Sequence, residues 1–403
     1  MIKKKILIIT PHFWPENFLI NEIAKKFSKN KIDTTILTGL PNYPSGEIYK
    51  SYRKVKKVKN YKYENIKIIR FPIIPRKKGS SFDLTRNYLS FLINGFKAIQ
   101  NLKFHNYHIF VYAISPITTA LLGIYLKKKF KIKLTLWIQD LWPDSISATN
   151  HINNSFILYC ISKLVKYIYV NADNLIATSK FFVKNIRQYT NKKVHIVENS
   201  HFFSDQKFNN QKIQYKIRKY LKNYFCITYA GNLGHAQSIG TILKAAKILQ
   251  NDKKILFLII GDGAYKKQAI DFINLNKLNN IKILGPYAPE IITKICKKSN
   301  GLMLSLKKSK VLSMTIPNKF QTYLYCGVPI IAACDGITRQ LIKNYKIGFS
   351  NKAESASGIV KSILKLKKIN KKEIDKMSKR MRSTYRNNFE INKQIKKLEK
   401  IIF

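Results

Sequence analysis

The sequence lacks the residue patterns that cross-link secreted domains or bind metals. Its five cysteines are scattered over 403 residues, are odd in number and include no Cys-x-x-Cys pair. This usage argues against a disulfide framework or a zinc site and for a reducing cytoplasm. The histidines show no spacing typical of metal ligands, so we expect no metal.

Long hydrophobic runs are also scarce. Near the N-terminus, Ile6–Ile9 is closely followed by Pro11, so this run is too short for the core of a signal peptide and predicts a first strand. The charge-free run Ile109–Leu126 has about the minimum length of a membrane span. Because Pro116 divides it into a candidate strand and a candidate helix, we predict a buried strand–helix unit instead.

Acidic residues are few. The chain has 21 Asp and Glu against 74 Lys and Arg, a formal net charge of +53. This charge permits a nucleic acid, an anionic membrane or a phosphorylated substrate as partner. The lysines are spread along the whole length, as biased codon usage would also produce, and no nucleic-acid-binding motif stands out. An anionic membrane surface is therefore the preferred macromolecular partner, at roughly 1 kcal/mol for each nearby Lys or Arg.

Apolar strand candidates alternate with helical segments along most of the chain, which is typical of parallel sheets covered on both faces. The polar stretch Asn199–Lys219 separates two such series. We therefore predict an α/β fold with two Rossmann-like domains and a ligand at the carboxyl ends of the strands. The predicted strands are Ile6–Thr10, Thr34–Thr38, Ile66–Phe71, Ile109–Ala113, Leu134–Ile138, Leu175–Thr178, Val194–Val197, Cys226–Ala230, Ile255–Ile260, Ile281–Leu284, Gly301–Ser305 and Val328–Ala332.

Four loops of the second half follow predicted strands and contain glycine or proline. They are AGNLGHAQS (Ala230–Ser238), GDG (Gly261–Gly263), GPYAPE (Gly285–Glu290) and the start of SMTIPNKFQTYLYCGVPIIA (Ser313–Ala332). Glycine lets the backbone approach a diphosphate closely, and a helix N-terminus attracts anions. Each loop alone is consistent with an ordinary turn or helix start, but four at the same strand ends favour a phosphate-containing ligand. The sequence has no GxGxxG, no GxxxxGK[ST] and no DxD.

These segments resemble the donor-sugar domain of glycosyltransferase family 4, which has the GT-B fold. The resemblance rests on YAGNLGHAQSIGTILKAA, IIGDG, ILGPY and MTIPNKFQTYLYCGVPII, and in the first half on ILIITPHFWPE, ADNLIATSKFFVKNI and VEN. GLPNYPSGEIYKSYR, NYLSF and IQDLWPDS resemble a bacterial subgroup that assembles O-antigen, capsule and colanic acid and includes the N-acetyl-L-fucosamine transferases.

The resemblance implies a two-domain glycosyltransferase. We expect an acceptor-binding domain at 1–200, a nucleotide-sugar-binding domain at 201–375 and a C-terminal helix at 376–403 that returns to the first domain. The substrates would be a UDP-sugar and a polyprenyl-diphosphate-linked saccharide, without metal or cofactor. The enzyme would be cytoplasmic and peripheral on the inner face of the cytoplasmic membrane.

The resemblance also implies which loops hold the donor. The loop after the eighth predicted strand would face the diphosphate, the next two loops the nucleoside, and the Pro317–Thr322 helix start the phosphates and ribose. The residues expected at the donor site are Gly231, Asn232, Gly234, His235, Gln237, Asp262, Gly263, Tyr287, Pro317, Asn318, Lys319 and Thr322.

The chain departs from the family pattern at the charged positions. Asn232 and Gln237 lie near positions where the family carries an Arg and a Lys, and Met314 and Thr322 stand where it carries two glutamates. Lys319 is the leading substitute as counter-charge for the diphosphate, against the alternative of a solvated lysine. The first loop also lacks the usual glycine pair and reads Glu-Asn-Phe at residues 16–18.

An acceptor hydroxyl needs a base or a partner for its developing charge. The candidates are Asp140 and Asp144, which follow a predicted strand beside Trp142, and His12 and Glu16, which follow the first strand. A helix N-cap is the alternative role for Asp144.

The predicted helix Asn87–Leu102 is rich in Phe and Leu and follows a basic segment, so it is a candidate for docking on an anionic bilayer or, alternatively, an ordinary packed helix. Two other functions remain as alternatives to the transferase. One is a GT-B-fold UDP-sugar epimerase, and the other is a non-catalytic basic protein that binds membrane or nucleic acid.

Overall fold

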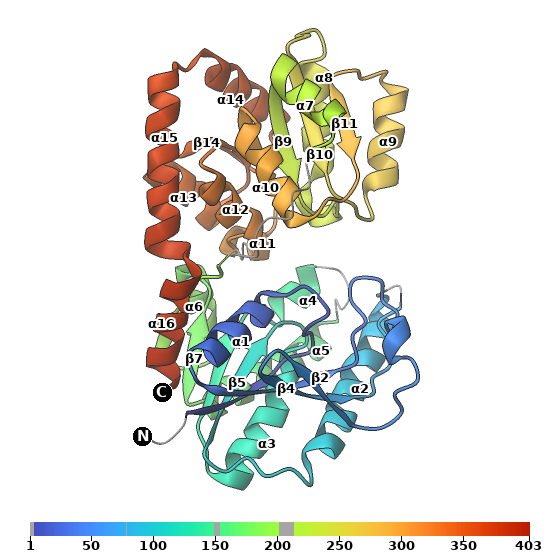
Figure 1. The fold of residues 1–403 in the computed structure, drawn as a ribbon, viewed down its shortest axis with the longest axis vertical. Coiled ribbons are helices and arrows are strands. Elements are labelled where there is room, and N and C mark those ends of the chain that lie inside the picture. The colour runs from blue at the N-terminus through green and yellow to red at the C-terminus, as the bar shows by residue number, and fades with distance from the viewer. Residues whose placement is uncertain (1–3, 78, 149–153, 201–212) are drawn as a thin grey trace. The chain divides into compact units, whose positions relative to one another are not determined.

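The computed structural model describes residues 4–77, 79–148, 154–200 and 213–403. It contains two compact units, drawn in Figure 1. Unit 1 is formed by Met1–Asn199 together with Ile391–Phe403, and unit 2 by Ser200–Glu390. The polar stretch that separates the two strand series lies partly outside the described residues, and its last residues begin a helix, α7 (Tyr215–Asn223).

Unit 1 contains an eight-stranded sheet in the order β3-β4-β2-β1-β5-β6-β7-β8. The pair β3–β4 is antiparallel and the other pairs are parallel. The strands are β1 (Lys5–Ile9), β2 (Asp33–Gly39), β3 (Lys59–Tyr63), β4 (Ile66–Phe71), β5 (Tyr107–Ala113), β6 (Leu134–Ile138), β7 (Asn174–Ala177) and β8 (Val194–Ile196).

Helices cover both faces of this sheet, because β5 sends alternate side chains to opposite sides. Phe110 and Tyr112 join an apolar cluster with side chains of α1 and α16, while Ile109 and Val111 contact α3 at Gly123. On the α3 face, α2 packs against α3 and α3 against α5. The helical elements are α1 (Leu19–Lys29), η1 (Lys50–Tyr52), α2 (Ser81–Ile99), η2 (Ile117–Thr119), α3 (Ala120–Phe130), α4 (Asp144–Ala148), α5 (Ser155–Asn171), α6 (Lys180–Ile186) and α16 (Ile391–Ile402).

The run Ile109–Leu126 therefore forms a strand and a helix, β5 and α3, as its proline suggested. Within the described ranges, no helix combines the length and the apolar character needed to cross a bilayer.

Unit 2 contains a six-stranded parallel sheet in the order β11-β10-β9-β12-β13-β14. Its strands are β9 (Phe225–Ala230), β10 (Ile255–Ile260), β11 (Ile281–Leu284), β12 (Gly301–Ser305), β13 (Ile330–Ala333) and β14 (Gly348–Asn351). Its helical elements besides α7 are η3 (His235–Gln237), α8 (Ile239–Ile248), α9 (Lys266–Leu275), α10 (Pro289–Lys298), α11 (Lys310–Met314), α12 (Asn318–Cys326), α13 (Gly336–Tyr345), α14 (Ala356–Lys368), α15 (Lys371–Thr384) and η4 (Tyr385–Phe389).

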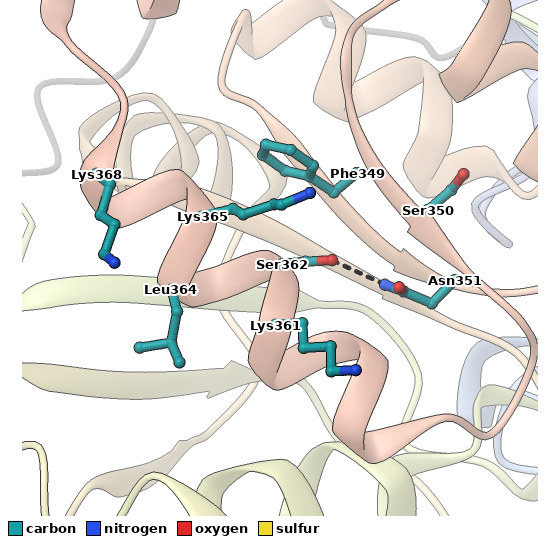
Figure 2. Close-up of a pocket in the computed structure, with 8 residues that line it drawn as sticks. All are labelled: Phe349, Ser350, Asn351, Lys361, Ser362, Leu364, Lys365 and Lys368. Atoms are coloured by element: carbon teal, nitrogen blue, oxygen red, sulfur yellow. Dashed lines mark hydrogen bonds between the residues drawn. The ribbon is translucent and has the colours of Figure 1, made fainter.

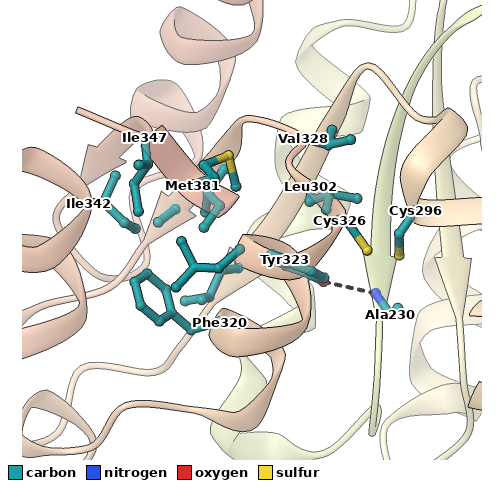
Figure 3. Packing of buried hydrophobic residues seen from close by; sticks show 14 of the residues in the cluster. Ala230, Cys296, Leu302, Phe320, Tyr323, Cys326, Val328, Ile342, Ile347 and Met381 are labelled. Atoms are coloured by element: carbon teal, nitrogen blue, oxygen red, sulfur yellow. Dashed lines mark hydrogen bonds between the residues drawn. The ribbon is translucent and has the colours of Figure 1, made fainter. Parts of the chain in front are cut away.

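Two apolar cores lie on opposite faces of the unit 2 sheet. Met303 of β12 faces a cluster with side chains of α8, α9 and α14, while its neighbours Leu302 and Leu304 face a cluster with α10, α12, α13 and α15. Figure 3 shows the second cluster, in which Phe320 and Met381 are both fully buried.

The C-terminal segment differs from the expectation of one returning helix at 376–403. Residues up to Glu390 belong to unit 2, because α15 and η4 bury Met381 and Phe389 in its core. Only α16 packs on unit 1, where Ile395 and Leu398 are buried.

Candidate functional site

Each sheet has a point where the chain reverses the direction in which it adds strands. In unit 2 the chain runs from β9 out to β11 and then returns to β12 and on to β14, so the reversal lies between β9 and β12. In unit 1 the corresponding point lies between β1 and β5. Loops that leave the carboxyl ends of such neighbouring strands diverge to opposite faces and open a crevice where α/β proteins bind ligands.

The loop after β9 is locked to the loop after β10 by backbone contacts. Leu233 N–H donates to Asp262 C=O over 2.8 Å, and Tyr265 N–H donates to Leu233 C=O over 2.8 Å. A Cβ at Gly261 would lie 2.0 Å from the Gly231 carbonyl oxygen, so only glycine fits there. The structure thus brings together the predicted residues of both loops, Gly231–Gln237 and Asp262–Gly263.

Lys319 lies against the β9 loop and has an aromatic partner. Its Nζ donates to Tyr229 Oη over 2.7 Å and lies 3.9 Å from the centre of the Tyr229 ring. Tyr229 Oη in turn donates to Asn232 C=O over 2.6 Å. A Cβ added to Gly231 would be 3.4 Å from Lys319 Nζ, which places the amine beside the loop backbone.

The charge of Lys319 is not neutralised by any carboxylate of the described residues. Burial lowers the pKa of the Lys319 amine to about 7, because no nearby anion offsets the lost hydration. A buried amine without an anionic partner is stabilised in its charged form when an anion binds beside it.

Tyr323 fixes α12, and with it the helix start at Asn318, to the sheet. Its hydroxyl accepts from Ala230 N–H over 3.1 Å, the hydrogen bond dashed in Figure 3. It also donates to Met303 C=O over 3.0 Å, so one side chain joins β9 and β12. Burial raises the pKa of Tyr323 well above its usual value, which keeps the hydroxyl protonated as a donor.

A second lysine reaches the same loops from β12. Lys307 N–H donates to Ala236 C=O over 2.9 Å, and Ser305 Oγ donates to Ser238 C=O over 3.3 Å. Lys307 is exposed and follows the carboxyl end of β12 at the reversal point. Sequence reasoning did not single it out, because a lysine in a lysine-rich chain carries little signal; its position directly after a predicted strand was the available clue.

Three further predicted donor residues, Asp262, Thr322 and Tyr287, make side-chain contacts of their own in unit 2. Asp262 forms an ion pair with Lys266 at 3.2 Å, and Thr322 Oγ1 donates to Asn318 C=O over 3.3 Å within α12. Tyr287 follows β11, the edge strand, and its hydroxyl donates to Gln214 Oε1 over 3.1 Å. It lines a groove of about 680 Å³ beside β11. Met314, which the family resemblance aligns with a glutamate, is buried in α11.

A separate hollow of about 480 Å³ lies at the other edge of the unit 2 sheet (Figure 2). It is lined by side chains of β14 and α14, among them Phe349, Lys361 and Lys365. None of the predicted donor residues borders it, and it is distinct from the loops at the carboxyl ends.

In unit 1, His12 and Glu16 form a buried pair at the end of β1. His12 Nδ1 lies 2.9 Å from Glu16 Oε1, and the ring stacks on Phe18 at 4.8 Å. The Glu16 carboxylate also accepts from the N–H groups of Asn42 and Tyr43, at 2.9 and 2.8 Å. Since a carboxylate only accepts, Nδ1 carries the proton and Nε2 is the nitrogen available as a base when the ring is neutral.

Asp140 lies at the end of β6, close to the same reversal point. Its carboxylate accepts a hydrogen bond from Ser115 Oγ, which follows β5 and also accepts from Trp142 Nε1 over 3.1 Å. Burial raises the pKa of Tyr88 and the negative charge of Asp140 adds to that shift, which places Tyr88 near the carboxylate. His12 follows β1 and Asp140 follows β6, and only β5 lies between these two strands in the sheet. Both residues are thus found at the carboxyl ends of neighbouring strands in unit 1.

Asp144 has a more structural environment. It is the first residue of α4, and its carboxylate accepts from Asn185 Nδ2 over 2.6 Å. This contact joins α4 to α6 and differs from an N-cap, in which the carboxylate would accept from a backbone N–H of the first turn of its own helix.

Comparison with known proteins agrees with this architecture. Residues 207–387 match the family model described as Glycosyl transferases group 1. A search of curated proteins gives no match to the sequence.

Solved structures of similar fold cover nearly the whole chain at low sequence identity. An E. coli structure described as trehalose-6-phosphate bound with UDP-2-fluoro glucose has a TM-score of 0.75 and 9% identity over 98% of each chain. Anabaena Alr3699/HepE in complex with UDP has a TM-score of 0.70 and 14% identity over 98% of each chain. A glycosyltransferase from Rickettsia africae ESF-5 has a TM-score of 0.69 and 17% identity, over 100% of this chain and 98% of the other.

The prediction of an α/β GT-B fold with two parallel-sheet domains is therefore confirmed. The prediction of a glycosyltransferase is confirmed at the level of a glycosyl transferases group 1 domain over residues 207–387. The resemblance to the fucosamine-transferase subgroup stays a prediction.

Proposed function

We propose that the chain transfers a sugar from a UDP-linked donor, bound at the β9–β12 reversal point of unit 2, to a lipid-linked saccharide bound at the carboxyl edge of the unit 1 sheet. The observation that carries the proposal is the Lys319 amine, which lies beside the Gly231 backbone without a carboxylate partner. A diphosphate is the ligand that suits a lysine, a glycine turn and a helix start together.

The donor site uses fixed positive groups to stabilise the leaving diphosphate. Lys319 and Lys307 would supply the cations that the family usually places in the β9 loop, and the α12 N-terminus adds roughly 0.3–1 kcal/mol for an anion near the surface. UDP as the nucleotide is supported by the Anabaena protein in complex with UDP and by the E. coli protein bound with UDP-2-fluoro glucose. The sugar of the donor would meet Thr322 and Met314 where the family has carboxylates.

The acceptor side offers two groups that could assist a hydroxyl. His12, held by Glu16 through Nδ1, can take a proton at Nε2, and Asp140 can take one at a carboxylate oxygen. We assign the acceptor as a polyprenyl-diphosphate-linked saccharide in the assembly of bacterial O-antigen or capsule. The transferred sugar would be an aminosugar such as N-acetyl-L-fucosamine, as the NYLSF and IQDLWPDS segments suggest.

The test is incubation of the purified protein with a panel of UDP-sugars, with and without polyprenyl-diphosphate-linked acceptors. The expected result is an extended lipid-linked product that forms only with the acceptor, with anomeric configuration read by NMR. An epimerised UDP-sugar that forms without acceptor would identify an epimerase instead. Absence of UDP binding by calorimetry would contradict the donor site and favour a non-catalytic binding protein.

A further inference from the structure

Three helices on one face of unit 1 expose an unusual amount of apolar surface. Among the described residues, half of the large hydrophobic side chains that are exposed belong to α2, α3 and α5, labelled in Figure 1. Phe82 and Phe156 are 70% and 71% exposed, values far above those of the aromatic side chains in the core. Monomeric soluble proteins seldom present large contiguous apolar patches, so such a face points to a partner.

The exposed side chains form continuous stripes. On α2, Phe82, Arg86, Leu89, Ile93 and Lys97 recur at helical spacing and are all exposed, while the opposite side of the helix is buried. Within the NYLSF segment only Leu89 belongs to this stripe, whereas Asn87 and Ser90 are buried. Asn87 donates to Ile74 C=O and Ser90 accepts from Ile74 N–H, so this segment fixes the loop before α2.

A second stripe runs along α5, and no residue in the N-terminal half of this helix is buried. Phe156, Tyr159, Lys163, Tyr167 and Val170 follow one another on its outer side. The buried residues of α5 are confined to its C-terminal half, at Val165, Ile168 and Tyr169.

The same face is strongly basic. The three helices carry seven Lys or Arg and a single acid, Asp83, which is bound to Ser80 at the start of α2. On α2 and on α5 a cation lies over an exposed aromatic ring. The Arg86 guanidinium is 5.4 Å from the centre of the Phe82 ring, and Lys163 Nζ is 5.0 Å from the centre of the Tyr159 ring. A surface that mixes aromatic side chains with lysine and arginine suits the interface of an anionic bilayer, where rings enter the headgroup region and cations meet phosphates.

The position of the stripes in the fold relates them to the acceptor edge. Asp173, just after α5, donates from its N–H to Leu134 C=O at the start of β6, so the C-terminal end of α5 lies at the amino ends of the strands. The N-terminal halves of α5 and α2 therefore lie toward the carboxyl edge, where His12 and Asp140 are found.

We infer that the exposed α2–α3–α5 face of unit 1 docks on an anionic lipid bilayer, with the N-terminal half of α5 as its main apolar contact. The inference deepens the proposed function, on which it rests for the lipid-linked acceptor. It also corrects the emphasis on Asn87–Leu102, since α2 begins at Ser81 and its bilayer-facing side starts with Phe82.

The first test compares binding to sedimentable vesicles that contain phosphatidylglycerol. Phe156→Ser with Tyr159→Ser should weaken binding at least about tenfold, because two large side chains no longer leave water. The matched control is Tyr215→Ser with Leu275→Ser, since these side chains are 75% and 84% exposed on unit 2. Equal weakening in both double variants, or none in either, would overturn the inference.

The second test separates charge from apolar contact. Lys128→Glu with Lys163→Glu should abolish the preference for phosphatidylglycerol over phosphatidylcholine vesicles, while Lys244→Glu with Lys267→Glu, on exposed positions of unit 2, should keep it. Loss of the preference in the unit 2 variant alone would assign docking elsewhere.

Cys160 offers a direct readout, because it is the only exposed cysteine of the five, all of which are described, and it lies on α5. An environment-sensitive fluorophore on Cys160 should shift to the blue when phosphatidylglycerol vesicles are added, and no shift would contradict the inference. UDP-glucose binding, measured on the same variants, should be unchanged. Failure of the wild-type protein to bind UDP would count against the proposed function and leave the vesicle result valid.

Discussion

At the scale of single residues, the Lys319 amine lies in surroundings that penalise its charge. Burial lowers its pKa from 10.5 to about 7, and its recorded hydrogen bond is to Tyr229 Oη. A bound diphosphate would favour the cation and raise this pKa again. Donor binding should therefore be coupled to uptake of a proton by Lys319.

The first prediction concerns this coupling. UDP-glucose, whose phosphates do not titrate near neutrality, should bind most tightly below pH 7 and lose up to about tenfold in affinity per pH unit above the free-state pKa of about 7. Lys319→Met should weaken binding by about 10–100-fold and remove this pH dependence, since charge-assisted hydrogen bonds contribute about 1.5–3 kcal/mol. Isothermal calorimetry in buffers of different ionisation enthalpy measures both quantities.

The same substitution should stabilise the free protein. Between pH of about 7 and 10.5, Lys319 carries a proton in the unfolded chain but not in the folded protein. The free-energy cost of burying this side chain is therefore largest at low pH and decreases as the pH rises through this range. Lys319→Met should therefore raise Tm at neutral pH, whereas Lys267→Met, at an exposed position, should change neither Tm nor binding. A lower Tm with unchanged affinity would show a purely structural lysine.

From the sequence, a candidate residue could be singled out where its chemistry and its position point to the same role, but not where an aromatic side chain makes a structural hydrogen bond. Lys319 could be singled out because it follows Pro317 at a helix start. Tyr229 and Tyr323 could not, because a tyrosine within an apolar strand or helix is indistinguishable from an ordinary core residue until its hydroxyl partner is known. The partner depends on strand order, which local pattern does not contain.

At the scale of elements, the loops of unit 1 are held by a buried carboxylate. Glu16 is 1% exposed and joins the loop after β1 to the loop after β2: it accepts from His12 and Phe13 N–H in the first and from the N–H groups of Asn42 and Tyr43 in the second. With these contacts made, we propose that Glu16 positions His12 and that His12 is the better candidate for the base.

The second prediction tests that role. Glu16→Gln replaces an acceptor with an N–H₂ group facing donors, so it should destabilise the protein by about 1–3 kcal/mol, measured by denaturant unfolding. It should also lower kcat more than it raises donor KM, because His12 loses its orientation. In a His12→Gln background, Glu16→Gln should have no further effect on kcat. Additive losses in kcat would mean that the two residues act independently, and a larger loss in Asp140→Asn than in His12→Gln would assign the base to Asp140.

Elements were predictable where burial on both sides leaves a continuous apolar run. Ile255–Ile260 and Gly301–Ser305 are such strands and have the predicted bounds, and Ile66–Phe71 also has them although Lys67 and Arg70 interrupt its apolar residues. β3 was not predicted, because this antiparallel edge strand reads KNYKY and is mostly exposed. β14 was missed for a similar reason, since GFSN has no apolar run and is only half-buried.

At the scale of the whole molecule, the two sheets share one logic. In both, the chain first forms the strands on one side of its first strand and then returns to form the strands on the other side. The candidate site residues lie in loops beside this reversal point. The alternation of strands and helices allowed two such sheets to be predicted, and the family resemblance predicted that the C-terminus returns to the first domain. Strand order, and the residue at which the chain passes from unit 2 to unit 1, depend on long-range contacts that no local pattern encodes. The helices α15 and α16 have similar sequence patterns, because both are basic and amphipathic, so these patterns do not show which of the two packs on unit 1.

The third prediction concerns that return. Ile395, Leu398 and Ile402 of α16 are buried against α1 and the unit 1 sheet, and Lys397 pairs with Glu198 at 2.9 Å. Three aliphatic side chains at about 1.5–3 kcal/mol each amount to an upper estimate of roughly 5–9 kcal/mol, comparable to the whole stability of a domain. Removing residues 391–403 should therefore unfold unit 1 at a much lower temperature and leave unit 2 folded, because unit 2 ends at Glu390. Calorimetric scanning should then show one transition shifted down and one retained, and UDP-glucose should still raise the Tm of the retained transition. A single transition that shifts as a whole would instead mean that the two units unfold cooperatively, and loss of the UDP-glucose effect would mean that the donor site depends on unit 1.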